Sequence, residues 1–423
     1  MAMKNIKKII CCALVLTFLI GAVACGKGMS KDTGNVVESD EKLTESADSA
    51  ENTEETENMD TEKNEEIKEP KKMNAVIEKV KGGRDAIVVI SHDDGDRSTA
   101  NYLVSEFERL DLRGTLSLIA SRVYDPVTGE RKADNIEFWQ GILDTGRFNI
   151  SSHTMTHSFW GMTDEEEEGY YSDYSGGTHE YEIEAGRITK ETKGSRDILR
   201  EIFPSQRILT FVKAGFGIHS SGVSLSDKSM EIIAQYYIGT RWDGGGLETI
   251  PSADPYKFKS FMARSGEDET KWIPLVDQAI EKKGAIVFLF HNIVPGTASG
   301  ISVEQEDTTK LFEYVAEKVG EGKVWCAYFE DAVIYTEEVR HAKVFSSILE
   351  DEITVSVTDD LDNEIYNLPL TVKCQVPDDW TSVVAEMPDG TVTKLEPFPG
   401  IAAGTYVHID IVPDSGDVVL RQG

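Results

Sequence analysis

Short, mainly apolar runs alternate with amphipathic stretches between residues 75 and 336. The runs at 86–90, 115–119 and 285–290 have the length of strands that are covered on both faces. Apolar residues recur at helical spacing in residues 100–110, 182–203, 229–236 and 308–319. This alternation predicts an α/β sandwich or barrel, in which reactive groups gather at the carboxyl ends of the strands.

The pattern changes after about residue 336, where only strand and turn signals remain. Strand-like segments occur at residues 353–357, 370–373, 382–385 and 406–411. They predict a small, separate β-sandwich of roughly 80 residues. Trp380 or Tyr406 could bind carbohydrate there, although isolated aromatic residues more often belong to a core, and the segment could simply cap the barrel.

The N-terminal segment has the pattern of an export signal. Lys4, Lys7 and Lys8 precede an apolar run over residues 9–20, which is short for a membrane span. The run ends in Gly-Ala-Val-Ala-Cys, and this sequence resembles a bacterial lipobox, which implies cleavage before Cys25 and acylation of its thiol. An ordinary secretory signal is the alternative, and both interpretations place the protein outside the cytoplasm.

Residues 26–74 lack aromatic side chains and are rich in charged and small polar ones, which predicts a disordered, extended tether. The whole chain has 75 acidic and 43 basic residues, a net charge of −32, so nucleic acid is a poor partner. Only Cys326 and Cys374 remain in the folded part. They make no disulfide framework, although a single bridge between them stays open.

Candidate catalytic residues follow three of the apolar segments. Asp93 and Asp94 precede Gly95 after the first run, where one carboxylate could ligate a metal while its neighbour accepts a proton. Taken alone, this is also a common turn sequence. His153 and His157 are four residues apart, a recurrent metal-ligand spacing.

His291 comes directly after the run 285–290, so it stands at a strand end, where a histidine can serve as a general acid. Satisfying backbone groups of a loop is the alternative role for such a residue.

In this order, the three elements resemble the motifs of the polysaccharide deacetylase family, also called the NodB-homology domain or carbohydrate esterase family four. Ser91-His92-Asp93-Asp94-Gly95 stands where the family has Thr-Phe-Asp-Asp-Gly, and His153-Thr154-Met155-Thr156-His157 matches the second motif without a mismatch. The resemblance covers roughly residues 86–335. It implies a distorted (β/α) barrel of the NodB type.

The resemblance also implies the role of each residue. Asp94, His153 and His157 would bind one divalent ion, usually zinc or cobalt in this family, while Asp93 is the catalytic base and His291 the catalytic acid. Three protein ligands leave an open position on the metal, as hydrolysis requires. The implied activity is removal of N- or O-linked acetyl groups from an acetylated polysaccharide.

The third and fourth motifs depart from the family pattern. Lys213 stands at the arginine that orients the catalytic base, so either Lys213 or Arg241 could pair with Asp93. Phe216 matches the residue whose backbone N–H is the oxyanion donor, but the motif's proline is missing. For the aspartate and tryptophan of the fourth motif, the chain offers Asp243 and Trp242, a pair that a glycine-rich turn would explain equally well.

These observations predict a lipoprotein signal peptide over residues 1–24, acylated Cys25 with its linker over 25–75, a NodB-type domain over 76–338 and a small β-sandwich over 339–423. The expected partners are the polysaccharide and, through the lipid on Cys25, the cell membrane. Two other functions stay open: a carbohydrate-binding lipoprotein that has lost the reaction, and a metal-dependent hydrolase of another bond, such as a phosphodiester.

Overall fold

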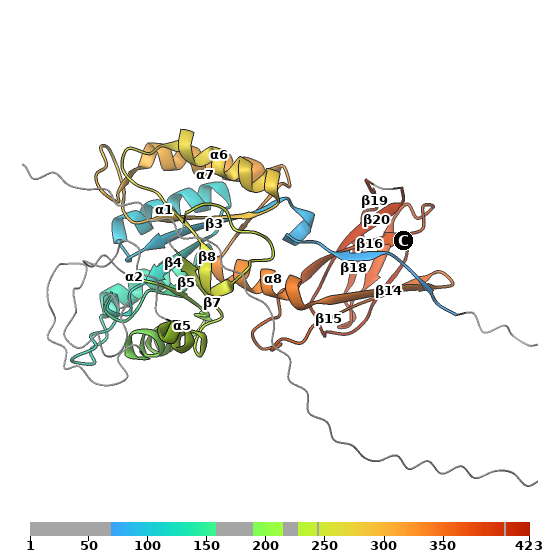
Figure 1. The fold of residues 1–423 in the computed structure, drawn as a ribbon, viewed down its shortest axis with the longest axis horizontal. Coiled ribbons are helices and arrows are strands. Elements are labelled where there is room, and N and C mark those ends of the chain that lie inside the picture. Colours follow the sequence, from blue (N-terminus) through green and yellow to red (C-terminus); the bar gives the residue numbers. More distant parts are fainter. Residues whose placement is uncertain (1–68, 158–188, 215–226, 243–244, 402) are drawn as a thin grey trace, which may run out of the picture. The chain divides into compact units, whose positions relative to one another are not determined.

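A parallel sheet that nearly closes on itself forms the larger part of the molecule (Figure 1). The computed structural model describes residues 69–157, 189–214, 227–242, 245–401 and 403–423, which belong to one compact unit. The strands follow the order β8-β7-β6-β5-β4-β3-β10-β9, with β13 also paired to β3, and all of these pairs are parallel. The strands are β3 (Ala86–Asp93), β4 (Gly114–Leu118), β5 (Phe148–Ser152), β6 (Thr210–Val212), β7 (Gly239–Trp242), β8 (Phe258–Lys259), β9 (Phe261–Met262), β10 (Ala285–Phe290) and β13 (Val324–Ala327).

The two edge strands of this sheet are consecutive in the sequence. β8 and β9 lie at opposite ends of the strand order, yet only Ser260 separates them along the chain. The edges therefore approach each other within one residue, and the sheet forms a nearly closed barrel. The (β/α) barrel predicted from the sequence is confirmed.

Alternation along β3 determines which of its side chains point into the barrel. All eight residues of β3 are buried. Val88 and Ile90 belong to the core between sheet and helices, whereas Ile87 and Val89 belong to a second core with Val287 of β10. Because successive strand residues point to opposite faces, the last residue of β3 shares the face of Ile87 and Val89.

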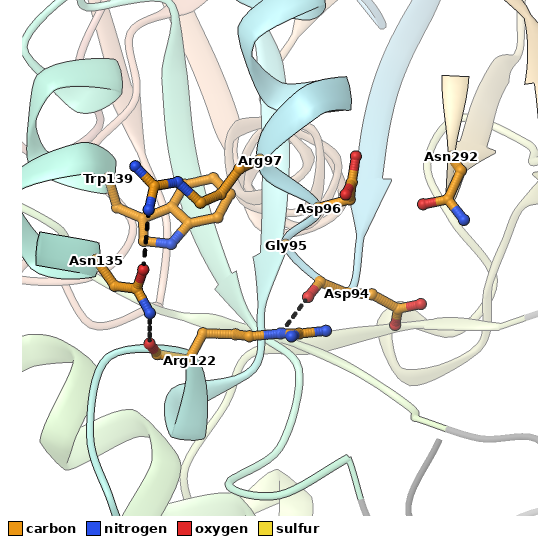
Figure 2. A pocket seen from close by; sticks show the side chains of 8 residues that line it. All are labelled: Asp94, Gly95, Asp96, Arg97, Arg122, Asn135, Trp139 and Asn292. Atoms are coloured by element: carbon orange, nitrogen blue, oxygen red, sulfur yellow. Dashed lines mark hydrogen bonds between the residues drawn. The ribbon is translucent and has the colours of Figure 1, made fainter. Parts of the chain in front are cut away.

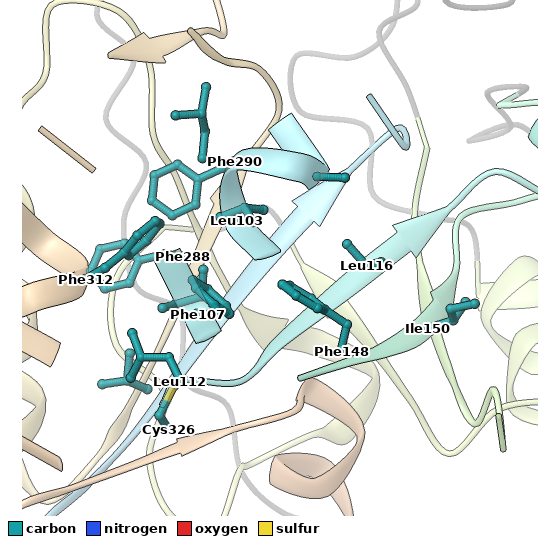
Figure 3. Close-up of a cluster of buried hydrophobic side chains, with 14 of the residues drawn as sticks. Leu103, Phe107, Leu112, Leu116, Phe148, Ile150, Phe288, Phe290, Phe312 and Cys326 are labelled. Carbon is teal, nitrogen blue, oxygen red and sulfur yellow. The ribbon is translucent and has the colours of Figure 1, made fainter. Parts of the chain in front are cut away.

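Helices cover the outer face of the sheet and build its main core. Phe107 of α1 stacks on Phe148 of β5 with 5.2 Å between ring centroids, and meets Phe312 of α7 edge-on at 5.3 Å (Figure 3). The helices are α1 (Arg97–Leu110), α2 (Ala133–Leu143), α4 (Ser195–Ile202), α5 (Asp227–Ala234), α6 (Glu269–Lys282), α7 (Gln305–Gly320) and α8 (Phe329–His341). A π-helical turn, η3 (Lys190–Gly194), precedes α4.

The C-terminal part is a β-sandwich, as predicted. One antiparallel sheet has the order β1-β14-β15-β21-β17-β18 and the other β19-β20-β16-β2, around a common apolar core. Its strands are β1 (Lys71–Lys72), β2 (Ala75–Ile77), β14 (Lys343–Leu349), β15 (Glu352–Thr358), β16 (Leu370–Val376), β17 (Val383–Glu386), β18 (Val392–Leu395), β19 (Phe398–Pro399), β20 (Thr405–Ile411) and β21 (Val418–Gln422). Cys326 and Cys374 are both free and buried, so the bridge between them is absent.

The sandwich takes strands from both ends of the described chain. β1 pairs with β14, and β2 pairs with β16. The expected start of the NodB-type domain at residue 76 therefore falls inside a strand of the sandwich. Helix α8 contributes to both cores, since Ile334 packs in the barrel and Tyr335 packs in the sandwich.

Some of the sequence predictions concern residues outside the described part. These are the signal segment, Cys25, most of the linker, Phe216 and Asp243. Within the part that the structure describes, no helix combines the length and the apolar character needed to cross a membrane.

Replacing Phe107 by alanine is expected to lower the free energy of unfolding by about 3–5 kcal/mol, because its ring is fully buried between two other aromatic rings. Urea denaturation measures the loss. As a control, Phe345→Ala removes a ring that is 59% exposed and should change stability by no more than about 0.5 kcal/mol. Equal losses in the two variants would contradict the packing described here.

Glu338 of α8 should make stability depend on pH. Burial raises the pKa of its carboxyl to about 8 from the ordinary value of 4.5, although the backbone N–H of Leu368 donates to Oε1 and opposes the rise. The folded state therefore keeps a proton that the unfolded state releases, and stability falls as pH rises from about 4.5 to about 8.

A Glu338→Gln variant should lose this part of the pH dependence and gain stability relative to the parent chain at pH 8. Thermal unfolding at pH 5, 6.5 and 8 measures the difference. Glu317→Gln, on an exposed side chain of α7, is the matched control and should leave the pH dependence unchanged. A Glu338→Gln variant with the parent's pH profile would show that the carboxyl is ionised in the folded state.

Candidate active site

The candidate residues come together at the carboxyl ends of the barrel strands. Asp93 ends β3 and Asp94 follows it, while His153 and His291 come directly after β5 and β10. Arg241 lies in β7. Their side chains are all buried, with no more than 8% exposed. Parallel strands place their carboxyl ends at one edge of the barrel, which explains why residues far apart in the sequence meet there.

Asp94, His153 and His157 form a compact set of potential metal ligands. One ligand atom from each lies within 4.8 Å of the others, and no other such group occurs in the described ranges. Asp94 Oδ1 is 3.1 Å from His153 Nε2 and 3.0 Å from His157 Nε2. Ligand atoms about 2 Å from a tetrahedral ion lie about 3.3 Å apart, so the spacing suits zinc.

The hydrogen bond of His153 tests whether a cation fits. Nδ1 lies 3.0 Å from the carbonyl oxygen of Val212, so in the neutral ring it is Nδ1 that carries the proton. Nε2 then turns a lone pair toward the carboxylate oxygen of Asp94. Two acceptors this close repel unless a proton or a cation lies between them, and this arrangement is the one that a metal-ligating histidine requires.

The pKa values at the triad show the same coupling. When a proton takes the place of the cation, the imidazoles donate hydrogen bonds to Asp94. Burial alone would raise the pKa of the Asp94 carboxyl, but these hydrogen bonds from His153 and His157 outweigh burial and hold the pKa far below its usual range. Burial would lower the pKa of His153, and its bond to Asp94 together with the charge of Asp93 raises it instead. For His157 burial dominates, and the pKa falls.

Asp93 is held apart from the triad by a different partner. Its Oδ2 forms a buried ion pair with the guanidinium of Arg241, and Ser91 Oγ donates to Oδ1 at 3.4 Å. Burial alone would raise the pKa of Asp93, but the charge of Arg241 lowers it below the ordinary value. Asp93 is therefore an ionised carboxylate beside the candidate metal site, as a general base must be.

Two histidines flank this arrangement. Burial lowers the pKa of His291, whose Nδ1 has no partner among the described residues; Asp243, the expected partner, lies outside them. His92 stands where the family motif has phenylalanine, and burial lowers its pKa to about 4. At neutral pH His92 is therefore uncharged, and neither of its ring nitrogens has a hydrogen-bond partner among the described residues.

Two other candidates flank the mouth. Lys213 follows β6 directly, and the residue before it, Val212, accepts the hydrogen bond of His153 Nδ1 with its carbonyl oxygen. Trp242 is the last residue of β7.

Glu191 fixes the loop that carries the two histidines, a role that the sequence did not reveal. This buried carboxylate accepts the backbone N–H groups of Met155 and Thr156, both at 2.9 Å, and the hydroxyl of Thr156 at 2.7 Å. The loop contains two non-glycine residues with positive φ, Thr154 at 71° and His157 at 64°. Such conformations persist only where the surroundings hold them.

The backbone of Asp94 is also strained, and a hydrogen bond also stabilises it. Its φ is 71°, and its carbonyl oxygen accepts a hydrogen bond from Arg122 Nε at 3.1 Å (Figure 2). Arg122 ends the short 3₁₀ turn Ala120–Arg122 after β4. Nothing in the sequence around Glu191 or Arg122 distinguishes these two residues from ordinary surface charges, because their partners are distant in the chain.

Glu191→Gln should weaken metal binding, because the amide nitrogen would face backbone donors where the carboxylate now accepts three hydrogen bonds. We expect the zinc dissociation constant to rise roughly 10- to 100-fold, the range seen when groups that orient metal ligands are changed. Competition with a chromogenic chelator measures it. Glu201→Gln, on an exposed carboxylate of α4, is the control; equal affinity in both variants would contradict the role of Glu191.

Comparison with known proteins gives distant matches. No protein-family model matches the chain. A gellan lyase from Bacillus sp. is 24% identical over 270 residues, which are 57% of this chain and 11% of that protein. The chain thus spans about a tenth of the length of this curated relative.

Solved structures similar to the chain include a deacetylase, an esterase and a pseudoenzyme. A variant of peptidoglycan deacetylase PdaC from Bacillus subtilis is 13% identical, covering 62% of this chain and 94% of that one, with a TM-score of 0.34. A family 4 acetyl xylan esterase from Clostridium thermocellum, in complex with a cobalt ion, is 11% identical over 60% and 91%, with a TM-score of 0.37. A CE4 family pseudoenzyme from Bacillus anthracis is 13% identical over 59% and 66%, with a TM-score of 0.34.

These TM-scores indicate only a distant structural similarity. By its sequence motifs, which come together at the mouth of a (β/α) barrel, the chain resembles the polysaccharide deacetylases of carbohydrate esterase family four.

Proposed function

We propose that the chain is a metal-dependent hydrolase that removes N- or O-linked acetyl groups from a cell-wall or extracellular polysaccharide. One observation carries the proposal: the buried Asp94, His153 and His157 set lies beside a second carboxylate, Asp93, which is held ionised by its own partner. A binding site needs no such separation of a ligand from a base, whereas hydrolysis does.

Each residue then has a defined task. Asp94, His153 and His157 would hold a divalent ion, zinc or cobalt, which would supply a Lewis acid for the acetyl carbonyl and the attacking water. Asp93 accepts the proton of that water, and Arg241 keeps Asp93 ionised and oriented. His291 donates a proton to the leaving nitrogen or oxygen. The Val212 carbonyl sets the tautomer of His153 so that Nε2 remains available as a ligand.

The proposed location follows from the N-terminal sequence. Lys4, Lys7 and Lys8, the apolar run over 9–20 and Cys25 support export and acylation of the chain, which would tether the enzyme to the outer face of the bacterial cell membrane. The polar, acidic segment that follows would let the hydrolase reach polysaccharide beyond the membrane.

An acetate-release assay, combined with a measurement of zinc binding, distinguishes the role of the base from the role of the metal ligands. Zinc-loaded chain is expected to release acetate from N-acetylglucosamine oligomers, acetylated xylan or both, which distinguishes amide from ester substrates. Asp93→Asn should lower kcat/KM by roughly 10²- to 10⁴-fold, because general-base catalysis contributes about that factor. It should still bind zinc.

In contrast, His153→Ala should lose both activity and tight zinc binding. Glu201→Gln, remote from the site, should keep both. If the parent chain binds zinc but releases acetate from no sugar, the proposal is wrong and the non-catalytic carbohydrate-binding function takes its place.

A further inference from the structure

A cavity of about 490 Å³ opens beside the candidate metal site (Figure 2). This volume falls within the roughly 300–1,000 Å³ of small-molecule sites. It lies against the end of β3 and the first turn of α1, with α2 opposite. The lining residues are Asp94, Gly95, Asp96, Arg97, Arg122, Asn135, Trp139 and Asn292.

Two arginines of this cavity are fixed in place by its own residues. Arg122 donates from Nε to the Asp94 carbonyl, and its own carbonyl accepts from Asn135 Nδ2 at 2.6 Å. Arg97 donates from Nη1 to Asn135 Oδ1 at 3.3 Å, and its guanidinium lies 4.1 Å from the centre of the Phe138 ring. Asn135 therefore connects the two arginines, as Figure 2 shows.

Neither guanidinium has a carboxylate oxygen within 4.0 Å among the residues that the structure describes. Other arginines of this acidic chain do: Arg109, Arg131 and Arg421 each pair with a glutamate. Cation charge that is oriented but not neutralised, at the rim of a cavity, is what recognition of an anionic group requires.

The carboxylate of Asp96 does not neutralise the two arginines. Its Oδ1 accepts from Ser98 Oγ at 2.6 Å and from the Thr99 N–H at 2.8 Å, capping α1. Asp94 would be neutralised by a bound divalent ion. With that ion present, the charge facing the cavity becomes net positive.

We propose that this cavity is a subsite for a sugar residue bearing a carboxylate, adjacent to the acetylated residue, so that the substrate is an acidic polysaccharide. The inference rests on the proposed function. A singly charged carboxylate fits better than a phosphate dianion, because the charge of Asp96 also faces the cavity. The carboxylate could belong to a uronic acid or to the lactyl ether of muramic acid.

Calorimetric binding to the zinc-loaded full chain tests the subsite, in an Asp93→Asn background so that no acetyl group is removed. The probes are oligogalacturonate trimer, a disaccharide containing N-acetylmuramic acid, and neutral xylotriose. At least one acidic probe should bind more tightly than xylotriose. Arg97→Gln should then raise the dissociation constant of that probe roughly tenfold or more, the factor expected for the loss of one charge-assisted hydrogen bond.

Two matched variants complete the design. Arg97→Lys should restore part of the affinity, because it keeps the charge without the planar fork. Arg131→Gln removes an equal charge from an exposed arginine that pairs with Glu201, outside the cavity, and should change nothing. The acidic probe that responds to Arg97→Gln identifies the source of the carboxylate.

Xylotriose binding as tightly as both acidic probes would overturn the subsite, and so would equal weakening by Arg97→Gln and Arg131→Gln. This failure is distinguishable from failure of the proposed function, because the binding measurement needs no turnover. If the chain releases acetate but Arg97→Gln leaves the affinity for the acidic probes unchanged, the protein is a deacetylase without this subsite.

Discussion

The burial of two neighbouring carboxylates at the barrel mouth is the constraint that the rest of the site satisfies. Asp93 and Asp94 are almost inaccessible, and an unpaired charge in such a position costs several kcal/mol. Arg241 compensates the first carboxylate, and a proton or cation shared with the two imidazoles compensates the second. Because the two compensations are separate, adjacent aspartates acquire different chemistry: one stays a free base while the other is held in a ligand set.

Backbone strain accompanies this arrangement. Asp94, Thr154 and His157 all have positive φ, which costs non-glycine residues of order 1–3 kcal/mol each. Hydrogen bonds from distant elements stabilise the strained segments. Arg122 donates to the carbonyl of Asp94, and Glu191 accepts from backbone N–H groups of the loop between the histidines. The ligand positions are therefore defined by the protein, so that a cation entering them needs little rearrangement of the chain.

The sequence predicted the features that local patterns encode. Apolar runs located the central strands, and the positions of Asp93 and His291 at strand ends indicated where chemistry would lie. The sequence left Lys213 and Arg241 as alternative partners of Asp93, because only the barrel's closure determines which side chain crosses its interior. Glu191 was missed for the same reason. Its three hydrogen bonds join segments 35 residues apart or more.

The two short strands that precede the barrel have a consequence for how the molecule is made. β1 and β2 complete sheets whose other strands lie beyond residue 342. During synthesis β1 stays unpaired until the barrel and β14 have been translated, and β2 stays unpaired until β16 has been translated. Their lengths of two and three residues suit that interval, because such short edges offer little template for aggregation, and β1 consists of two lysines. The sandwich can thus close only after the barrel has been translated, because strands β14 to β21 all follow the last barrel strand, β13.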